Sequence, residues 1–271
     1  DLADEQGMLL WVELPMWMPR PTDALRRQLP IEYERLIRQA RSHPSVILYS
    51  LGCELSSEIG DDILAPLYSL AKSLVGDALV RDNSGSGEAF GGLLDEHTDY
   101  YDYHFYSELQ FLRPLLDQFS PRWRASQPFL LGEYGDKDTF RDLGRLKEEL
   151  GALPWWASAD PKVNPQGARW QYDLPRQDER LRRAGLTGKL VALEAASRRE
   201  GLYHRKRTIE QTRLYREVSG YVVTGETDTP ISTAGVLDHA GKLKYPAGPF
   251  HAFNSETVLL LAWDRRRAWV R

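Results

Sequence analysis

The sequence predicts an α/β protein built on a parallel sheet, and two observations carry this prediction. Short apolar stretches alternate with segments of helical period along most of the chain, and no two neighbouring stretches are joined by a hairpin turn. Six stretches are predicted as strands, near residues 8, 46, 78, 100, 129 and 220. Eight strand–helix units close a barrel, and the chain opens on what resembles the end of a helix. We therefore expect about strands 3 to 8 of a (β/α)8 TIM barrel, with two units upstream.

The apolar run at residues 46–51 illustrates why these stretches are predicted as strands. It is too short for a free-standing helix and rich in branched residues, so we expect a strand buried on both faces, as parallel sheets require. Residues 8–12 form a similar run behind Gly7, which fits the glycine cap of a preceding helix. The other predicted strands are 78–81, 100–106, 128–133 and 221–224.

Helices are predicted between these strands. Apolar residues at helical spacing predict a helix over 30–41 with Pro30 in its first turn, and another over 62–75 that ends at Gly76. Further helices are predicted over 109–116, 138–150 and 201–218. The glycine-rich segment 82–87 lacks the spacing of a phosphate-binding loop and is predicted as a flexible turn.

The predicted organisation is a barrel domain over residues 1–250 and the start of a separate β domain over 251–271, because residues 257–263 alternate without a helix behind them. A long insertion at 136–200, rich in aromatic residues, separates predicted strands 7 and 8. Insertions of this kind commonly cover the mouth of an active site. We expect the chain to be part of a longer polypeptide with other domains.

Composition excludes several classes of partner. The net charge is −4 with mixed signs, so neither nucleic acid nor an anionic membrane is an expected partner. No run approaches the ~18 apolar residues of a membrane span. Cys53 is the single cysteine, which excludes an internal disulfide and a multi-cysteine zinc site but does not indicate a compartment. The eight Trp and thirteen Tyr suit either a packed core or the flat apolar walls of a sugar site.

Several motifs that would indicate other chemistry are missing from the sequence. It contains no His-x-x-x-His ladder and no acidic calcium loop, so a required metal is not expected. It also contains no serine elbow or dinucleotide-binding glycine pattern at a strand end, so no cofactor is expected.

Two glutamates stand in similar settings at the ends of predicted strands, in Leu51-Gly-Cys-Glu54 and Leu131-Gly-Glu133. The carboxyl ends of barrel strands converge on one mouth, so the two carboxylates are expected to face each other. Glycoside hydrolysis uses such a pair, at about 5–5.5 Å when the reaction retains configuration. Repulsion between them is expected to keep one protonated, so that Glu54 serves first as acid and then as base. The alternative is that each carboxylate is simply favoured by the dipole of the following helix.

Three segments resemble glycoside hydrolase family 2, which includes β-galactosidases, β-glucuronidases and β-mannosidases. The segment His43-Pro-Ser-Val-Ile-Leu-Tyr-Ser-Leu-Gly-Cys-Glu54 is similar to the acid/base segment of that family, residues 1–15 to its third strand, and residues 128–135 to its nucleophile strand. The resemblance covers residues 1–135 and, more loosely, 200–235. It implies a (β/α)8 barrel with Glu54 as acid/base after strand four, Glu133 as nucleophile on strand seven, and β-sandwich domains upstream.

The sequence departs from the family pattern at two positions. The family usually carries Asn before the acid/base glutamate, where its amide contacts the sugar 2-hydroxyl, and this chain carries Cys53. A thiol is a weak donor and acceptor, so that contact is expected to be lost or made by another residue. A Trp commonly ends the eighth strand of the family, and here Thr224 takes its place. The replacement wall is expected from Trp155, Trp156 or Trp170.

Other candidate site residues lie at strand ends. His104 is expected to orient Glu133 or to contact a sugar hydroxyl, and Tyr106 to hydrogen-bond the nucleophile, as a strand-six Tyr does in related barrels. The alternative for both is a core position with satisfied hydrogen bonds. Further substrate-binding candidates, chosen by position alone, are Glu13, Trp17 and Asp228.

The predicted function is hydrolysis of terminal β-linked sugars by a retaining, exo-acting β-glycosidase of the β-galactosidase-like family, with a carbohydrate as the partner. Two alternatives stay open. The changes at Cys53 and Thr224 are compatible with a barrel that binds carbohydrate without cleaving it. An endo-acting β-glycanase of a related barrel family is the other alternative.

Overall fold

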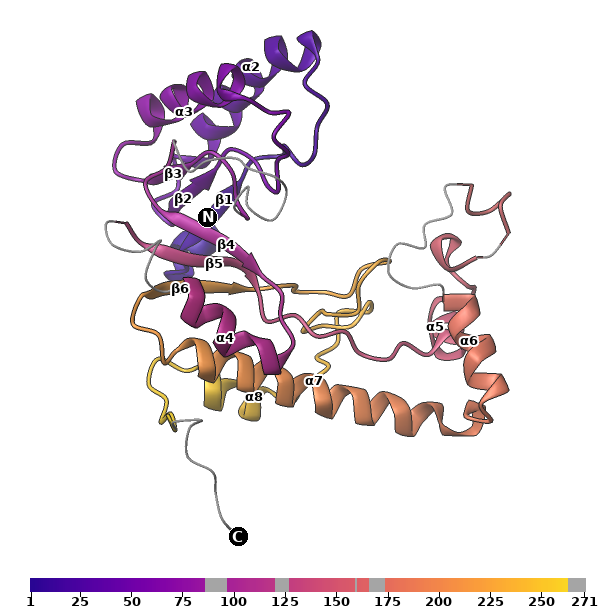
Figure 1. The fold of residues 1–271 in the computed structure, drawn as a ribbon. Helices are drawn as coiled ribbons and strands as arrows, with labels where there is room; N and C mark the ends of the chain where they lie inside the picture. The colour runs from indigo at the N-terminus through magenta and orange to yellow at the C-terminus, as the bar shows by residue number, and fades with distance from the viewer. Residues whose placement is uncertain (86–96, 120–126, 159, 166–173, 263–271) are drawn as a thin grey trace. The chain divides into compact units, whose positions relative to one another are not determined.

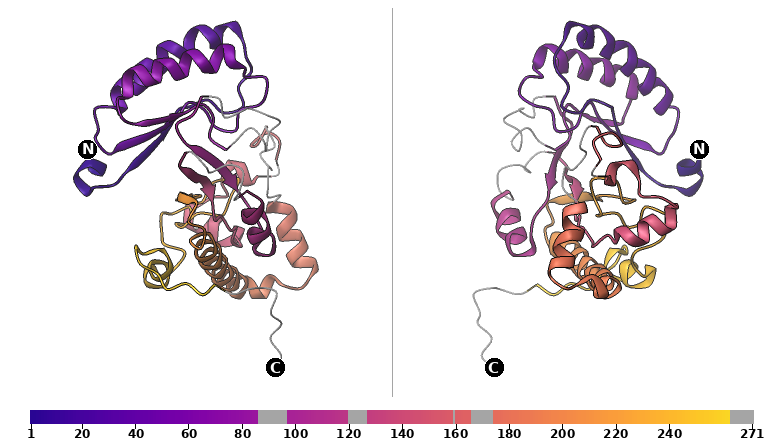
Figure 2. Two further views of the ribbon diagram at one scale, coloured as in Figure 1. Left: turned by 60° about the vertical axis from the view of Figure 1, so that its left-hand side comes forward. Right: turned by 90° about the vertical axis from the view of Figure 1, so that its right-hand side faces the viewer.

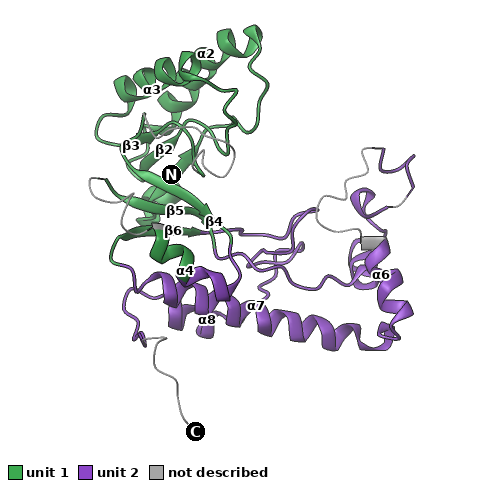
Figure 3. Cartoon of the chain, viewed as in Figure 1, with its two compact units in different colours: residues 1–106, 114–134, 216–222 green, residues 107–113, 135–215, 223–271 purple. Residues whose placement is uncertain are grey.

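The chain divides into two units in the computed structural model, which describes residues 1–85, 97–119, 127–158, 160–165 and 174–262. The first unit comprises residues 1–106, 114–134 and 216–222, and the second comprises residues 107–113, 135–215 and 223–271 (Figure 3). All six predicted strands are present (Figure 1). Their bounds are β1 (Leu10–Glu13), β2 (Val46–Ser50), β3 (Leu79–Arg81), β4 (Tyr101–Phe105), β5 (Phe129–Tyr134) and β6 (Val218–Val223).

The strands form two three-stranded sheets with the orders β1-β2-β3 and β4-β5-β6. Strand β2 runs parallel to both β1 and β3, and β4 runs parallel to β5. The strands of these three pairs therefore end at the same edge of their sheet, which is the arrangement that the alternating pattern predicts. His104 and Glu133 are direct partners in the β4–β5 register.

Helices α2 (Asp23–Ala40) and α3 (Asp61–Val75) lie side by side over the sheet of β1, β2 and β3 (Figures 1 and 2). Their buried faces join the strands in one core, which contains Leu14, Met16, Leu29, Tyr33, Ile37, Tyr49, Leu51, Leu55, Ile59, Ile63, Leu64, Leu67, Ala71 and Val80. The Tyr33 hydroxyl donates a hydrogen bond to the Leu51 carbonyl at 2.5 Å. This contact ties α2 to the carboxyl end of β2.

The prediction that residues 46–51 are buried on both faces holds only for the end of the run. Tyr49 and Leu51 are fully buried, whereas Ile47 is 37% exposed. Helices α2 and α3 contribute the core on one face of the strand, and the exposed Ile47 shows that the amino end of β2 is open on the other. Burial on both faces therefore begins where the strand approaches its carboxyl end.

Two predicted helix bounds are wrong. Helix α2 begins at Asp23 and contains Pro30 in its interior, because the Thr22 hydroxyl accepts the Leu25 N–H at 3.1 Å and caps the helix there. The buried stripe that starts with Leu29 outweighs the cost of an internal proline, about 3 kcal/mol. Helix α7 runs over Leu190–Thr212 instead of 201–218, since residues 190–200 are strong helix formers.

Helices α1 (Leu2–Gln6) and α4 (Leu109–Phe119) agree with the sequence-based predictions, and α5 (Leu143–Leu150) begins five residues later than the helix predicted over 138–150. Helices α6 (Leu174–Arg183) and α8 (Ala247–Asn254) and the short 3₁₀ turns η1 (Trp155–Ala157) and η2 (Thr187–Lys189) are not among the elements predicted from the sequence. Gly7 closes α1 in the left-handed conformation, with φ 67°, as predicted. Among the helices of the described residues, none combines the length and apolar character needed to cross a bilayer.

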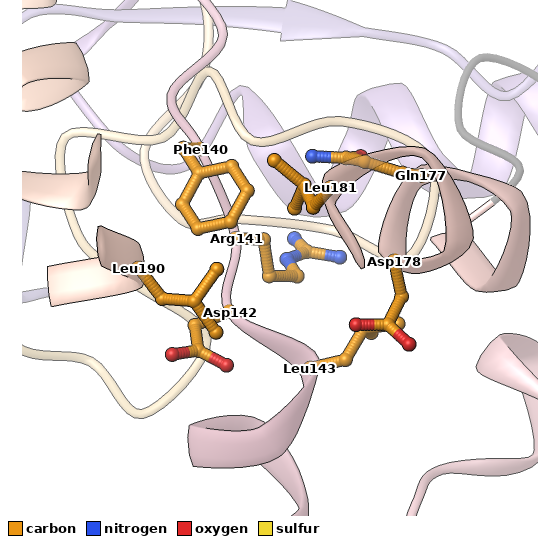
Figure 4. A pocket seen from close by; sticks show the side chains of 8 residues that line it. All are labelled: Phe140, Arg141, Asp142, Leu143, Gln177, Asp178, Leu181 and Leu190. Atoms are coloured by element: carbon orange, nitrogen blue, oxygen red, sulfur yellow. The ribbon is translucent and has the colours of Figure 1, made fainter. Parts of the chain in front are cut away.

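The second unit contains a small hollow between residues 140–143, α6 and the start of α7 (Figure 4). Its volume is about 10 Å³, which is room for a single water molecule. Residues 255–262 form neither helix nor strand, and residues 263–271 lie outside the described residues. The β domain predicted over 251–271 stays a prediction.

Candidate active site

Glu54 leaves the end of β2 in a strained backbone conformation. Its φ is 49°, in the left-handed region that non-glycine residues rarely adopt, and its N–H donates to the Ser84 carbonyl at 2.8 Å. The preceding residue is held as firmly, because the Cys53 N–H donates to the Met16 carbonyl at 2.9 Å. Strain of this kind persists only where the surroundings enforce it, and it clusters at functional sites.

His104 lies between the two candidate carboxylates. Its Nδ1 atom is 2.9 Å from Glu54 Oε1 and 3.6 Å from Glu133 Oε1, and only 2% of its side chain is exposed. The structure therefore brings Glu54 and Glu133 together, as their positions at the strand ends predict. It places His104 in contact with both of them.

A buried relay holds the other side of the His104 ring. The Ser84 hydroxyl lies 3.0 Å from His104 Nε2 and donates its proton to Asp102 Oδ2 at 2.6 Å. The Gly85 N–H donates to the same carboxylate oxygen at 2.9 Å. Because Ser84 has one proton and gives it to Asp102, its oxygen accepts the N–H of Nε2. The relay thereby fixes the ring so that Nδ1 faces the two glutamates.

Two glycines make room for this relay. The ring of His104 packs over Gly85, which has φ 89°, and Asp102 packs against Gly132. A Cβ at Gly132 would lie 2.2 Å from Asp102 Oδ1 and 2.9 Å from the Trp11 ring. A side chain at either position would collide with His104 or Asp102, so both positions require glycine.

We expect Gly132→Ala to lower the free energy of unfolding by about 1–3 kcal/mol, because the added methyl group overpacks β5 against Asp102. Urea unfolding followed by tryptophan fluorescence measures the change. Gly188→Ala is the matched control, since a Cβ there meets nothing within 4 Å. If Gly132→Ala were as stable as that control, the close packing of Asp102 on β5 would be refuted.

Two exposed aromatic side chains contact the carboxylates from the solvent side. The Trp17 indole N–H donates to Glu54 Oε2 at 3.1 Å, and the Tyr106 hydroxyl donates to Glu133 Oε2. The rings are 55% and 46% exposed, so neither is a core residue. The Cys53 thiol, which is buried, donates a weak hydrogen bond to Glu133 Oε1 at 3.8 Å.

The charges at this site favour a proton on His104 instead of on Glu54. The hydrogen bond from His104 lowers the pKa of Glu54. Burial alone would lower the pKa of His104, but the hydrogen bond with Glu54 and the charge of Glu133 outweigh burial and raise it. The expected elevation of the Glu54 pKa by repulsion from Glu133 is therefore wrong, because the imidazole between them carries the compensating positive charge.

Two further groups at the site have shifted pKa values. Partial burial of the carboxyl group raises the pKa of Glu13, with a smaller contribution from the charge of Glu133. Burial, together with the carboxylates of Glu13 and Glu133, raises the pKa of the Cys53 thiol well above its usual range. Cys53 is consequently a neutral thiol at physiological pH, and Glu13 joins the cluster as an additional acidic group.

The remaining predicted site residues lie in the second unit. Asp228 is engaged in an ion pair there, since Lys244 Nζ lies 2.8 Å from its Oδ1 atom. Trp155 is 54% exposed, and the Arg141 guanidinium stacks on Trp156 with 5.1 Å to the ring centroid. Thr224 belongs to the same unit. Trp170 lies outside the described residues, so a replacement aromatic wall stays a prediction.

Sequence reasoning missed Ser84 and Asp102. The segment 82–87 was predicted as a flexible turn, but Asp82, Asn83 and Ser84 are at most 2% exposed. The Leu55 N–H donates to Asn83 Oδ1, and the Ser84 hydroxyl donates to Asp102 Oδ2. One available signal was the spacing of Asp102 and His104, which places two polar side chains on the same face of a buried strand.

Comparison with known proteins identifies the fold. The sequence profile described as "Glycosyl hydrolases family 2, TIM barrel domain" matches residues 24–152. Among solved structures, the chain resembles the FMN-binding β-glucuronidase of Faecalibacterium prausnitzii L2-6, with 16% identity and a TM-score of 0.62 over 93% of this chain and 35% of that one. A search of the curated proteins finds no match.

Two other solved structures are similar to the same degree. The β-glucuronidase of Ruminococcus gnavus has 15% identity and a TM-score of 0.61, over 96% of this chain and 42% of that one. The family 2 β-galacturonidase of Eisenbergiella tayi, bound to galacturonate, has 15% identity and a TM-score of 0.58, over 90% and 40%. At such identities the likeness shows the fold alone, and it confirms the TIM-barrel class. The chain spans between 35% and 42% of the length of these structures.

Proposed function

Residues 24–152 belong to the TIM barrel domain of glycoside hydrolase family 2, and from this premise we propose that the chain carries the catalytic centre of a retaining β-glycosidase. Glu133 is the nucleophile and Glu54 is the acid/base. The observation that supports this proposal is the position of His104 Nδ1, 2.9 Å from Glu54 and 3.6 Å from Glu133. Two carboxylates that contact one ring nitrogen are close together, which favours the short spacing of retaining enzymes over the roughly 6.5–9.5 Å of inverting ones.

In the first step of the proposed reaction, Glu133 attacks the anomeric carbon while the glycosidic oxygen departs. The departing oxygen takes the proton shared by Glu54 and His104, and a covalent glycosyl ester forms on Glu133. The hydrogen bond from Tyr106 orients the attacking carboxylate. In the second step Glu54 accepts a proton from water, the water oxygen attacks the anomeric carbon, and Glu133 leaves as a carboxylate.

The proposed substrate is a terminal β-linked sugar, which makes the enzyme exo-acting. The three solved structures described above are named for β-glucuronide and β-galacturonide chemistry, and the family resemblance extends to β-galactosides. Hydrolysis of a panel of nitrophenyl β-glycosides that includes these three sugars would identify the preferred ring. We expect the contact with the sugar 2-hydroxyl to differ from that in the rest of the family, because Cys53 stands where the family usually carries Asn.

We expect a 2-deoxy-2-fluoro β-glycoside of the preferred sugar that carries a good leaving group, such as fluoride or dinitrophenolate, to label the protein once. Fluorine slows both steps, but the good leaving group keeps the first step faster than the second, so the ester on Glu133 accumulates. Mass spectrometry of the intact protein and of its peptides measures the label and its position. Glu133→Gln is the control that should stay unlabelled. A protein that binds the sugar but is never labelled would be a carbohydrate-binding barrel, and this outcome would refute the proposed function.

A further inference from the structure

The candidate active site also gathers the donor atoms of a metal site. Single donor atoms of Cys53, Glu54 and His104 all lie within 4.8 Å of one another. Glu133 provides a fourth, since its Oε1 atom is 3.8 Å from Cys53 Sγ and 3.6 Å from His104 Nδ1. One sulfur, one imidazole nitrogen and two carboxylate oxygens form a donor set that suits zinc.

Two of the donor separations are close to those of a tetrahedral ion, and a third is shorter. With zinc–sulfur bonds of about 2.3 Å and zinc–nitrogen or zinc–oxygen bonds of about 2.0–2.1 Å, the donors of a tetrahedral site are roughly 3.3–3.6 Å apart. Glu133 Oε1 lies 3.8 Å from Cys53 Sγ and 3.6 Å from His104 Nδ1, whereas His104 Nδ1 and Glu54 Oε1 are hydrogen-bonded at 2.9 Å. An ion would therefore have to replace the proton of that hydrogen bond and move the two atoms apart by about half an ångström.

The surroundings of His104 supply a second and independent indication. A metal-binding histidine almost always donates the N–H of its other nitrogen to a carboxylate, carbonyl or water, which orients the ring and leaves the first nitrogen free for the metal. Here Nε2 contacts Ser84 at 3.0 Å, and Ser84 in turn donates to the buried carboxylate of Asp102. The ring thus presents Nδ1 to Cys53 and the two glutamates.

The ligands are also mounted on rigid structure. Cys53 is 6% exposed, and its backbone forms bridges to Trp17 on one side and to Ser84 on the other. His104 and Glu133 lie in β4 and β5 and are register partners. Donors on paired strands keep their spacing without a loop having to close, so little conformational entropy is lost on binding.

We propose that Cys53, Glu54, His104 and Glu133 bind Zn²⁺ or another thiophilic divalent cation. On binding, the Cys53 thiol releases its proton to solvent and becomes a thiolate ligand, and the proton shared by His104 and Glu54 is also released. No group is oxidised or reduced. Because two protons leave, the affinity rises with pH. The ion occupies both proposed catalytic carboxylates, so it inhibits hydrolysis; this consequence, unlike binding itself, rests on the proposed function.

Titration of the full-length protein with Co²⁺, which replaces Zn²⁺ and absorbs light, tests the site. We expect one equivalent of Co²⁺ to give a thiolate-to-cobalt charge-transfer band with the strong visible bands of a tetrahedral ion, and Zn²⁺ to abolish both. Cys53→Ser should lose the charge-transfer band. Ser84→Ala should keep the band but bind about 10–100-fold more weakly, since it removes only the support of His104.

A second cluster in the first unit provides the internal control. Asp1, Asp4 and His43 also lie within 4.8 Å of one another, but they include no sulfur. Binding that shows no charge-transfer band and disappears in His43→Asn would locate the metal there and overturn the proposal. Unchanged binding in Cys53→Ser would overturn it as well.

The same titration separates the metal site from the glycosidase. A charge-transfer band in a protein without hydrolytic activity would refute the proposed function and leave the metal site standing. An active enzyme that shows no band and is not inhibited by Zn²⁺ would refute the metal site and leave the function standing. If Zn²⁺ inhibits the active enzyme, and inhibits the Cys53→Ser variant by a smaller fraction of that variant's own activity, the result supports both the metal site and the proposed function.

Discussion

Glu133→Gln is expected to lower kcat by on the order of 10⁴-fold or more while the protein stays folded. The amide keeps the size of the side chain and its contact with Tyr106 but cannot attack the anomeric carbon. Steady-state kinetics with a nitrophenyl glycoside measures the loss, and urea unfolding confirms that stability is retained. Because Glu133 is 31% exposed at its side chain, the substitution removes no buried charge and should be well tolerated.

The matched variant for this experiment is Glu108→Gln. Glu108 is a carboxylate of the second unit whose side chain is 64% exposed, and it takes no part in the candidate site. Its substitution should leave kcat within about twofold of the parent, since surface changes away from a site have small effects. Comparable activity in Glu133→Gln and Glu108→Gln would contradict the role given to Glu133.

His104→Asn is expected to move the alkaline limb of the pH profile of kcat/KM to lower pH. In the parent, the pKa of His104 is raised above its ordinary value of 6.5. The imidazole therefore keeps the proton that it shares with Glu54 up to the raised pKa. Activity falls as the pH rises through that pKa, because the proton is then lost. Without the imidazole, Glu54 must hold the proton itself, with a carboxyl pKa closer to its ordinary value of 4.5. The limb therefore shifts downward.

The size of this effect should depend on pH. We expect a loss of about 10²-fold or more at pH 8 and a much smaller loss near pH 5, in line with the usual contribution of general acid catalysis. Ser84→Ala keeps the imidazole and removes only its support, so it should shift the limb in the same direction by less. A merely structural role for His104 predicts an equal loss at every pH, and that result would contradict the shared proton.

The sequence was sufficient for the strands and for the two glutamates at their ends. Each strand is a short apolar run, and parallel strands must deliver their carboxyl ends to one edge, so Glu54 and Glu133 could be paired before any coordinates. Their pairing required no knowledge of side-chain contacts.

The surroundings of the glutamates could not be predicted in the same way. The relay from Asp102 through Ser84 to His104 joins a strand with the loop after another strand, and such contacts leave no local periodicity. For the same reason the carboxylate of Asp228, a candidate by position, is engaged with Lys244 in the second unit. The sign of the Glu54 pKa shift depended on His104, which local sequence did not place against it.

Chemical rescue with azide tests most directly the claim that Glu133 is the nucleophile and Glu54 the acid/base. The anomeric configuration of the glycosyl azide shows which of the two roles the removed carboxylate had. With Glu133→Ala and an activated β-glycoside, azide should take the place of the nucleophile and give an α-glycosyl azide, identified by NMR. With Glu54→Ala, azide should attack the ester on Glu133 and give a β-glycosyl azide. A β-glycosyl azide from Glu133→Ala, or an α-glycosyl azide from Glu54→Ala, would contradict the assignment of the two residues.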